Sequence, residues 1–480
     1  MSERTQLETG LDSDWTPERV ALAGRHTFIV LVAGIVIGLF AAAMQLYYIC
    51  ALIGMLLLAG LIAWQFESTL ALYALIAFIP FGRTPDIAVG GSGVGKGLYV
   101  SELMLGFLLA IWILKYIWGN LPPNRIKSAF YLPVGLYLVF CFINVWNSFL
   151  FWDPHVNQRY QYPTVNFIEI MLRVLSVGAL VMMATSIRDK KWLWPITIAL
   201  MISGIFNLVN SLMGSRIPIM ASWWVLLLFL PAGYMAALLM DNRKRVIIRL
   251  FAAAALAILI YAAFVRNVSW VSGWMGLFVV LLTVSWLENK KLFLALLAVG
   301  VVGIGISWSF VDSQVIAASQ EEGDYDRFDL MKGGAMYAAK FPLGVGLGNY
   351  RTYNTFYYGE KWGTTSYTSA HGTYSQLLAE TGYPGTFLFL SILVAGFCWL
   401  LKNYRQMPRG PSKMFILAVL GQMAGISAAS FIGDYIIPTY HNGGIFTFST
   451  TIYSWLIWGV AIAHIRISRE EALGSVDSDS

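Results

Sequence analysis

Ionisable side chains gather in one stretch of this apolar chain, from about Asp312 to Thr381. The charged residues that stand out in it are Asp324, Asp326, Arg327, Asp329, Arg351 and Lys361. His371 lies near its end, and a neutral imidazole can accept a proton from an incoming hydroxyl group. We therefore predict a reactive site here, with His371 as general base. The alternative is a histidine that only makes a surface hydrogen bond.

The segment that starts at His371 predicts a short helix that would hold the imidazole in place. Ser369 is the candidate cap of this helix, and Gly382-Tyr-Pro-Gly385 is expected to end it. Backbone N–H groups at a helix start favour a nearby anion, so a phosphate leaving group fits beside the histidine. Gly382 and Gly385 are then supporting residues of the site.

Three alternating glycines precede the histidine, at Gly344, Gly346 and Gly348. Glycine allows a backbone to approach a ligand closely, but this pattern alone is weak evidence for nucleotide binding. The alternative is a simple turn after a helix predicted over Asp326–Lys340.

Composition identifies the class of protein that must position these residues. The chain has 480 residues, of which 58% are hydrophobic and 12% charged, against about 25% charged in soluble proteins. It is therefore predicted to be an all-α, polytopic membrane protein. The net charge of +6 does not indicate a nucleic-acid partner, because cytoplasmic loops of membrane proteins collect Lys and Arg.

The three cysteines, Cys50, Cys141 and Cys398, lie in apolar segments and are expected to be core residues. No cluster of Cys and His has zinc-ligand spacing. We expect neither a metal nor a cofactor.

A membrane span needs roughly 20 mostly apolar residues, and the sequence offers about fourteen candidates, or twelve to thirteen if the short ones merge. They lie near 28–44, 46–65, 68–81, 101–118, 129–150, 164–186, 192–213, 217–240, 246–264, 268–286, 291–310, 383–401, 413–431 and 445–464.

Basic residues fix the direction of these spans. With the N-terminus inside, successive inner loops carry Lys115, Arg125 and Lys127; Arg188, Lys190 and Lys191; Arg243, Lys244, Arg245 and Arg249; Lys290 and Lys291; and Lys402, Arg405, Arg409 and Lys413. This is the positive-inside pattern. It predicts cytoplasmic tails at 1–27 and 467–480, a transmembrane domain at 28–466, and an extracytoplasmic catalytic loop at 311–382.

Basic residues on the outer side need a separate explanation. Arg216, Arg266 and Arg327 all map to the extracytoplasmic surface. Guanidinium groups bind phosphate well because they are planar, permanently charged and bidentate. Together the three are predicted to clamp a lipid diphosphate. The alternative is that each contacts lipid headgroups or pairs with an acidic residue.

Arg173 lies inside the sixth predicted span, four residues after Glu169, so the two share a helical face. A charge in mid-membrane costs at least about 2.5 kcal/mol on insertion scales. We interpret the pair mainly as a structural ion pair, with a supporting role at the site as the second interpretation.

The spacing of His371, ten residues, and Gly382-x-x-Gly385 resembles the motif of O-antigen ligases and the related O-antigen polymerases, which are bacterial integral-membrane glycosyltransferases. The preceding Arg327-Phe-Asp-Leu-Met and Phe341-Pro-Leu-Gly-Val-Gly-Leu-Gly-Asn are similar to the start of the same domain. These motifs cover about Arg327 to Gly385, and the many-span topology extends the resemblance over most of the chain.

The resemblance implies a C-type, metal-independent glycosyltransferase fold whose donor is a glycan on undecaprenyl diphosphate. It assigns the diphosphate-binding arginines to Arg216 and Arg266 and the loop histidine to His371. Two departures matter. Gly372 stands where the family usually has Asn, Ser or Gln, and no Pro-Asn pair follows Arg216. A His-Asn pair occurs later, which makes His441 the rival base.

The function so predicted is inverting glycan transfer at the outer face of the bacterial inner membrane. The acceptor would be another lipid-linked glycan, lipid A–core, or a protein; the partners would be these lipids and, in a polymerase, a chain-length regulator. Aromatic side chains on the outer side could stack against sugar rings. The candidates are Trp152, Tyr350, Trp362 and Tyr374. Alternatively, they belong to the aromatic belt at the membrane interface.

A lipid-linked oligosaccharide flippase or other transporter is the competing class. It is less favoured because the ionisable groups gather at one face rather than along a central cavity.

Overall fold

The computed structural model describes residues 66–76, 87–88, 97–98, 100–117, 128–156, 162–212, 224–266, 270–321, 327–362, 369–439 and 448–478. The chain divides into two compact units, Met1–Thr69 and Leu70–Ser480. The second unit contains every helix from α4 onward. The first two predicted spans, Arg216 and His441 lie outside the described residues.

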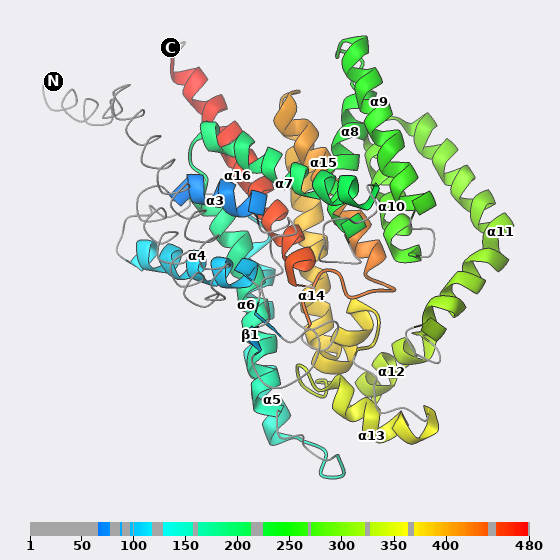
Figure 1. Ribbon diagram of the computed structural model, residues 1–480. Helices are drawn as coiled ribbons and strands as arrows, with labels where there is room; N and C mark the ends of the chain where they lie inside the picture. Colours follow the sequence, from blue (N-terminus) through cyan, green and yellow to red (C-terminus); the bar gives the residue numbers. More distant parts are fainter. Residues whose placement is uncertain are drawn as a thin grey trace, which may run out of the picture. The chain divides into compact units, whose positions relative to one another are not determined.

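The described part is almost entirely helical, which confirms the predicted all-α class (Figure 1). Its elements are α3 (Phe66–Ile76), β1 (Ile87–Ala88), β2 (Gly97–Leu98), α4 (Val100–Ile117), α5 (Tyr131–Leu150), α6 (Tyr162–Ser186), α7 (Lys190–Leu212), η2 (Trp224–Leu228), α8 (Phe229–Met240), α9 (Val246–Tyr261), η3 (Ala262–Arg266), α10 (Val271–Glu288), α11 (Lys290–Glu321), α12 (Arg327–Lys340), α13 (Tyr350–Trp362), α14 (Thr373–Gln406), α15 (Pro411–Ala429) and α16 (Phe448–Ser478). The two short strands pair antiparallel, with Ile87 opposite Leu98.

Each predicted span from 101–118 onward coincides with a helix or overlaps one. Within the described residues, 6 helices are long and apolar enough to cross a membrane: Tyr131–Leu150, Thr164–Ser186, Val246–Arg266, Val271–Glu288, Thr373–Gln406 and Pro411–Ala429. Met104–Ile117 and Val225–Met240 are shorter apolar helices. The protein is therefore a polytopic membrane protein, as the hydropathy predicted.

α15 lies at the centre of the helix bundle, and α5 and α9 lie at its edge. The most apolar window of α15 is 72% buried, and those of α5 and α9 are each 28% buried. α15 packs against α8, α10, α14 and α16. Small residues make the α10 contact close: a Cβ on Gly425 would lie 2.6 Å from the carbonyl oxygen of Gly276. Such contacts are typical of helix pairs in membranes.

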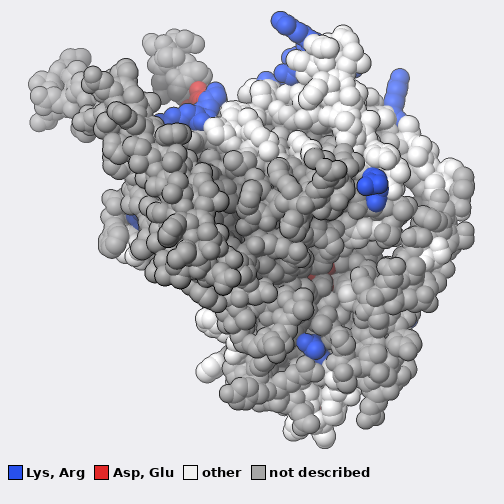
Figure 2. All heavy atoms as spheres, in the orientation of Figure 1, with Lys and Arg blue, Asp and Glu red and all other residues white. Residues whose placement is uncertain are grey.

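The basic side chains of the described part are concentrated toward one end of the bundle. In Figure 2 most of the Lys and Arg side chains drawn in blue lie in the upper half of the view. The α8–α9 and α14–α15 connections lie at the same end in Figure 1, whereas α12 and α13 lie at the bottom of the view. The predicted division into basic inner loops and an opposite catalytic loop requires such a separation. Which side of the membrane each end faces stays a prediction.

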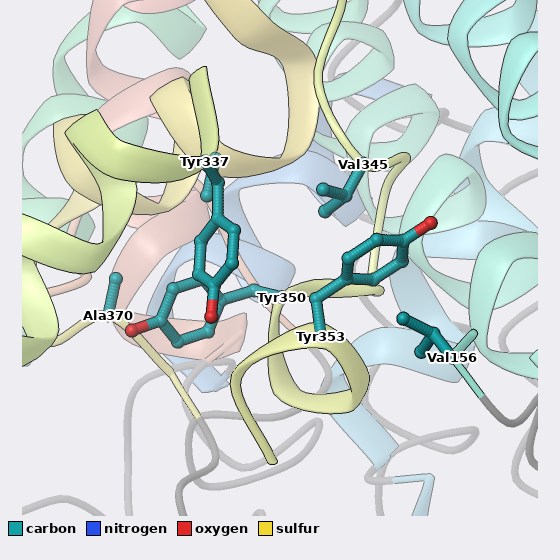
Figure 3. Close-up of a cluster of buried hydrophobic side chains, with 7 residues drawn as sticks. Val156, Tyr337, Val345, Tyr350, Tyr353 and Ala370 are labelled. Carbon is teal, nitrogen blue, oxygen red and sulfur yellow. The ribbon is translucent and has the colours of Figure 1, made fainter. Parts of the chain in front are cut away.

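The layer formed by α12 and α13 has its own small aromatic core (Figure 3). Tyr337 of α12 and Tyr350 and Tyr353 of α13 are almost fully buried. The ring of Tyr337 meets that of Tyr350 edge-on, with centroids 5.8 Å apart. Tyr350 therefore stabilises the layer, and its prediction as a face for a sugar ring is wrong.

One ionic network ties this layer to the end of α5. Tyr357 of α13 donates a hydrogen bond to Asp153, and Lys340 Nζ lies 3.7 Å from the same carboxylate. The hydrogen bond from Tyr357 lowers the pKa of Asp153 to about 2. The side chain of Asp153 is 10% exposed, whereas that of Lys340 is 52% exposed, so the network joins the three segments near the surface of the layer.

Asp153→Ala is expected to destabilise the protein by about 1–2 kcal/mol at neutral pH, because it removes charge-assisted hydrogen bonds. The folded-state pKa lies below the ordinary value near 4, so the stabilisation is complete above about pH 4 and is lost as the pH falls toward 2. Thermal unfolding in detergent measures this. The difference between wild type and variant should be constant from pH 7 to 5 and shrink below 4. Tyr357→Phe, which keeps the ring, should reproduce this trend, and a difference that persists unchanged down to pH 2 would contradict it.

Candidate active site

His371 lies in a strained turn immediately before α14. Its φ is 47°. Among the residues that the structure describes, it is the one non-glycine residue with a left-handed backbone conformation. This conformation costs an ordinary residue roughly 1–2 kcal/mol, although histidine adopts it more often than most. The helix therefore begins at Thr373, two residues later than predicted. Ser369 does not cap it; the Ser369 hydroxyl instead accepts a hydrogen bond from the amide of His371, at 3.2 Å.

The segment that follows α15 closes over the start of α14. The amide of Thr373 donates to the carbonyl oxygens of Ser430, at 3.0 Å, and Gly433, at 3.1 Å. A Cβ on Gly372 would lie 2.7 Å from the carbonyl oxygen of Phe431. This close approach leaves no room for a side chain at position 372, where the motif that the sequence resembles usually has Asn, Ser or Gln.

The same segment connects the histidine turn to the start of α10. The Thr373 hydroxyl accepts a hydrogen bond from the amide of Tyr435, at 3.2 Å. The Tyr435 hydroxyl in turn accepts one from Trp270 Nε1 at 2.9 Å and is hydrogen-bonded to Ser272 at 2.6 Å. Arg266 ends the π-helical turn just before these residues and is exposed.

α12 brings a second predicted arginine toward the histidine turn. α12 packs along α14, and the Met331 side chain lies 3.7 Å from the Cβ position of Gly372. Arg327 begins α12 one helical turn before Met331, so the two share a face of the helix. The structure thus brings α12 to the histidine turn through Met331, and it links His371 to the segment that follows Arg266 through Tyr435.

The glycine-rich loop, which contains Gly344, Gly346 and Gly348, packs against the break in α14. It forms a turn after α12, which is the alternative to nucleotide binding given above. Gly382 has a φ of 62°, and its Cβ position lies 2.0 Å from the carbonyl oxygen of Pro342. The amides of Val345 and Gly346 donate to the carbonyl oxygens of Ala379 and Glu380, both at 2.9 Å. A left-handed residue in this tight contact must be glycine.

Gly385 has a related packing role. Its Cβ position lies 2.4 Å from the Thr381 hydroxyl and 2.7 Å from the ring of Phe140 on α5. The two glycines of the motif therefore allow the break in α14 and its contact with α5; their supporting role at the site stays a prediction.

A guanidinium and two carboxylates lie together in the interior, where α6 meets α14. Arg173 Nη1 is 2.5 Å from Glu169 Oε2, as the spacing predicted, and Arg173 Nη2 is 3.8 Å from Glu380 Oε2. Arg173 is 2% exposed, and both carboxylates are 0% exposed. Arg173 also donates to the Tyr137 hydroxyl, at 3.4 Å. Buried charges of this kind need several partners to be tolerated.

Sequence reasoning assigned no role to Glu380 and Gln376 of α14. Gln376 Nε2 lies 2.5 Å from Glu380 Oε1, and the amide of Ala370 donates to Gln376 Oε1 at 2.8 Å. Their signal was present: they are four residues apart, so they share a helical face, and Leu377 lies beside them on the inward side. A glutamate on the apolar side of a predicted helix calls for a buried partner.

The described residues contain no group of three or more His, Cys, Asp or Glu that could hold a metal ion.

Comparison with known proteins adds one finding. No curated protein matches the chain, but residues 251–390 match the O-antigen ligase family. The matched residues run from α9 into α14 and include Arg266, Arg327 and the span from His371 to Gly385. The resemblance predicted from the sequence is thereby confirmed: over residues 251–390, this chain is similar to the O-antigen ligases.

Proposed function

We propose that this protein transfers a glycan from undecaprenyl diphosphate to a hydroxyl group of an acceptor at the outer face of the bacterial inner membrane. The match to the O-antigen ligase family supports glycan transfer in O-antigen biosynthesis. The same proposal includes four finer points: the identity of the donor, inversion at the anomeric carbon, independence of metal, and the cytoplasmic position of both termini.

One observation carries the proposal. His371 is held in a left-handed turn inside the matched residues, where α12, α14 and the segment from Ser430 to Tyr435 meet. Residues in strained backbone conformations cluster at functional sites, because surrounding contacts must hold them there. An imidazole can also accept a proton near neutral pH.

In the proposed reaction, the acceptor hydroxyl attacks the anomeric carbon while the bond from that carbon to the diphosphate oxygen breaks. His371 takes the hydroxyl proton, and undecaprenyl diphosphate leaves with the bonding electron pair. Arg266, with Arg327 and Arg216, would stabilise the charge that develops on the leaving diphosphate. Attack from the face opposite the leaving group inverts the anomeric carbon.

Reconstitution in liposomes with a synthetic undecaprenyl-diphosphate oligosaccharide tests the proposal against a flippase. Transfer predicts a new glycosidic bond and one released lipid diphosphate for each bond formed. A polymerase needs only the lipid-linked glycan, whereas a ligase or a protein glycosyltransferase also needs its own acceptor. Supplying a second lipid-linked glycan, lipid A–core or a protein as the acceptor separates the polymerase, the ligase and the protein glycosyltransferase. Movement of the intact donor across the bilayer without bond cleavage would contradict the proposal.

Arg266→Lys tests the diphosphate clamp separately from the chemistry. Lysine keeps the charge but lacks the planar fork that binds two phosphate oxygens at once. We expect the KM for the donor to rise about tenfold, because the substitution removes roughly one charge-assisted hydrogen bond to the diphosphate. Donor titrations at saturating acceptor measure this. Arg243→Lys, at an exposed position near the basic end of the bundle, is the matched control, and equal donor KM values for both variants would remove Arg266 from the clamp.

A further inference from the structure

The turn that carries His371 is anchored by one buried amide side chain. Gln376 is the fourth residue of α14, at the end of its first turn, and is 2% exposed. Its Oε1 accepts a hydrogen bond from the amide of Ala370, the residue before His371, at 2.8 Å. The side chain thus reaches back around the helix start and fixes the peptide that enters the strained turn.

The orientation of Gln376 is set from its other side. Its Nε2 donates to Glu380 Oε1 at 2.5 Å, so the amide has one orientation, with the nitrogen toward the carboxylate and the oxygen toward Ala370. The amides of Gly348 and Tyr350 also donate to Glu380. Glu380 is therefore held by the glycine-rich loop, and it holds Gln376 in turn.

The chain of contacts ends at the buried arginine. Glu380 Oε2 faces Arg173 Nη2 at 3.8 Å, and Arg173 is fixed by its 2.5 Å pair with Glu169 on α6. A path of buried polar contacts thus runs from a membrane-spanning helix to the peptide beside the histidine. Its link between Glu380 and Arg173 is an ion pair, because Glu380 Oε2 has no hydrogen-bond partner among the described residues. Inside a protein such a contact between charges is stronger than in water.

We propose that Gln376, oriented by Glu380 and Arg173, is a positioning residue for His371: it holds the histidine turn so that the imidazole reaches the acceptor hydroxyl. The inference rests on the proposed function, because it acts through His371 as the base. It assigns a catalytic consequence to the buried cluster that the sequence interpreted as mainly structural.

Gln376→Met tests the proposal, since methionine matches the length of glutamine but makes neither hydrogen bond. Gln422→Met is the matched control. Gln422 of α15 is also fully buried, and both ends of its amide form hydrogen bonds with α16. Its Nε2 donates to the Ser454 hydroxyl at 2.8 Å, and its Oε1 accepts from Trp458 Nε1 at 3.1 Å. Both variants lose two buried hydrogen bonds, but only one loses the anchor of the histidine turn.

For Gln376→Met we expect kcat to fall roughly 10- to 100-fold, the scale of a misplaced catalytic group, while the donor KM stays within about twofold. Gln422→Met should keep kcat within about twofold of wild type at a similar loss of thermal stability. In a His371→Ala background the Gln376 substitution should have no further effect on the residual rate, because there is no imidazole left to position.

Gln376→Glu provides a second variant should methionine prevent folding. It keeps an acceptor for the amide of Ala370 but places a carboxylate against that of Glu380. It too should lower kcat.

Two results would overturn the inference while leaving the proposed function intact: equal kcat for the Gln376 and Gln422 variants, or an undiminished effect of Gln376→Met in the His371→Ala background. Full activity of His371→Ala itself would defeat the proposed role of His371 and the positioning proposal with it.

Discussion

Arg173→Met is expected to destabilise the protein by about 3–5 kcal/mol, because it leaves the carboxylates of Glu169 and Glu380 buried without their counter-charge. Methionine fills much of the volume of the arginine stem, so the loss of charge dominates over the loss of packing. The effect should be larger than that of any exposed arginine, since surface ion pairs contribute about 0–1 kcal/mol. The variant should accumulate poorly in membranes and unfold at a markedly lower temperature in detergent.

The triple variant Arg173→Met, Glu169→Gln, Glu380→Gln is the control for this explanation. Removing all three charges together avoids an unpaired ion, so much of the stability should return. Transfer activity should stay low in the triple variant, because Gln376 loses its charged partner. Wild-type stability of the single Arg173 variant would show that the buried pair is not needed for folding.

His371→Gly is expected to separate activity from stability. Glycine adopts a φ of 47° without strain, so the melting temperature should stay the same or rise. Transfer should nevertheless fall about 10²- to 10⁴-fold, the usual contribution of a general base. The measurement is kcat for transfer beside the unfolding temperature of the same preparation.

His155→Ala is the matched histidine for this experiment. It follows α5 beside Asp153, which is bonded to Tyr357 of α13, and its side chain is 80% exposed. It should keep full transfer. A lower melting temperature for His371→Gly would mean that the turn is stabilised by the imidazole itself, and the strain would then have no functional meaning.

Much of the fold could be predicted from the sequence, because its determinants are local. A run of apolar residues predicts a spanning helix wherever it occurs, and the segments near 129–150 and 413–431 are such helices in the structure. The helix predicted over Asp326–Lys340 is present as α12. The break at Gly382 could also be predicted, since glycine and the nearby Pro384 interrupt helices by their own backbone properties.

The contacts between distant segments could not be predicted. Glu380 meets Arg173 across more than two hundred residues of chain, and no local pattern in a single sequence encodes that pairing. The sequence did indicate that Arg173 and Glu169 pair, because four residues along one helix fix their distance. It could not show that a second carboxylate completes the cluster.

The start of α14 was misjudged for a related reason. Ser369 has the right type and position for a cap, but the left-handed turn at His371 delays the helix, and the segment after α15 supplies carbonyl partners for Thr373 instead. Tyr350 was misjudged because an aromatic residue in a polar loop looks exposed until its neighbours are known. Here Tyr337 and Tyr353 bury it.

The most direct test of His371 as the base is the single-turnover rate of glycan transfer at saturating donor, compared between wild type and His371→Ala in liposomes. Saturation removes differences in donor affinity, and one turnover removes differences in product release. The predicted result is a rate at least about 100-fold lower for the folded variant, with donor binding unchanged. Transfer at the wild-type rate by a folded His371→Ala protein would contradict the proposed mechanism and make His441 the candidate base.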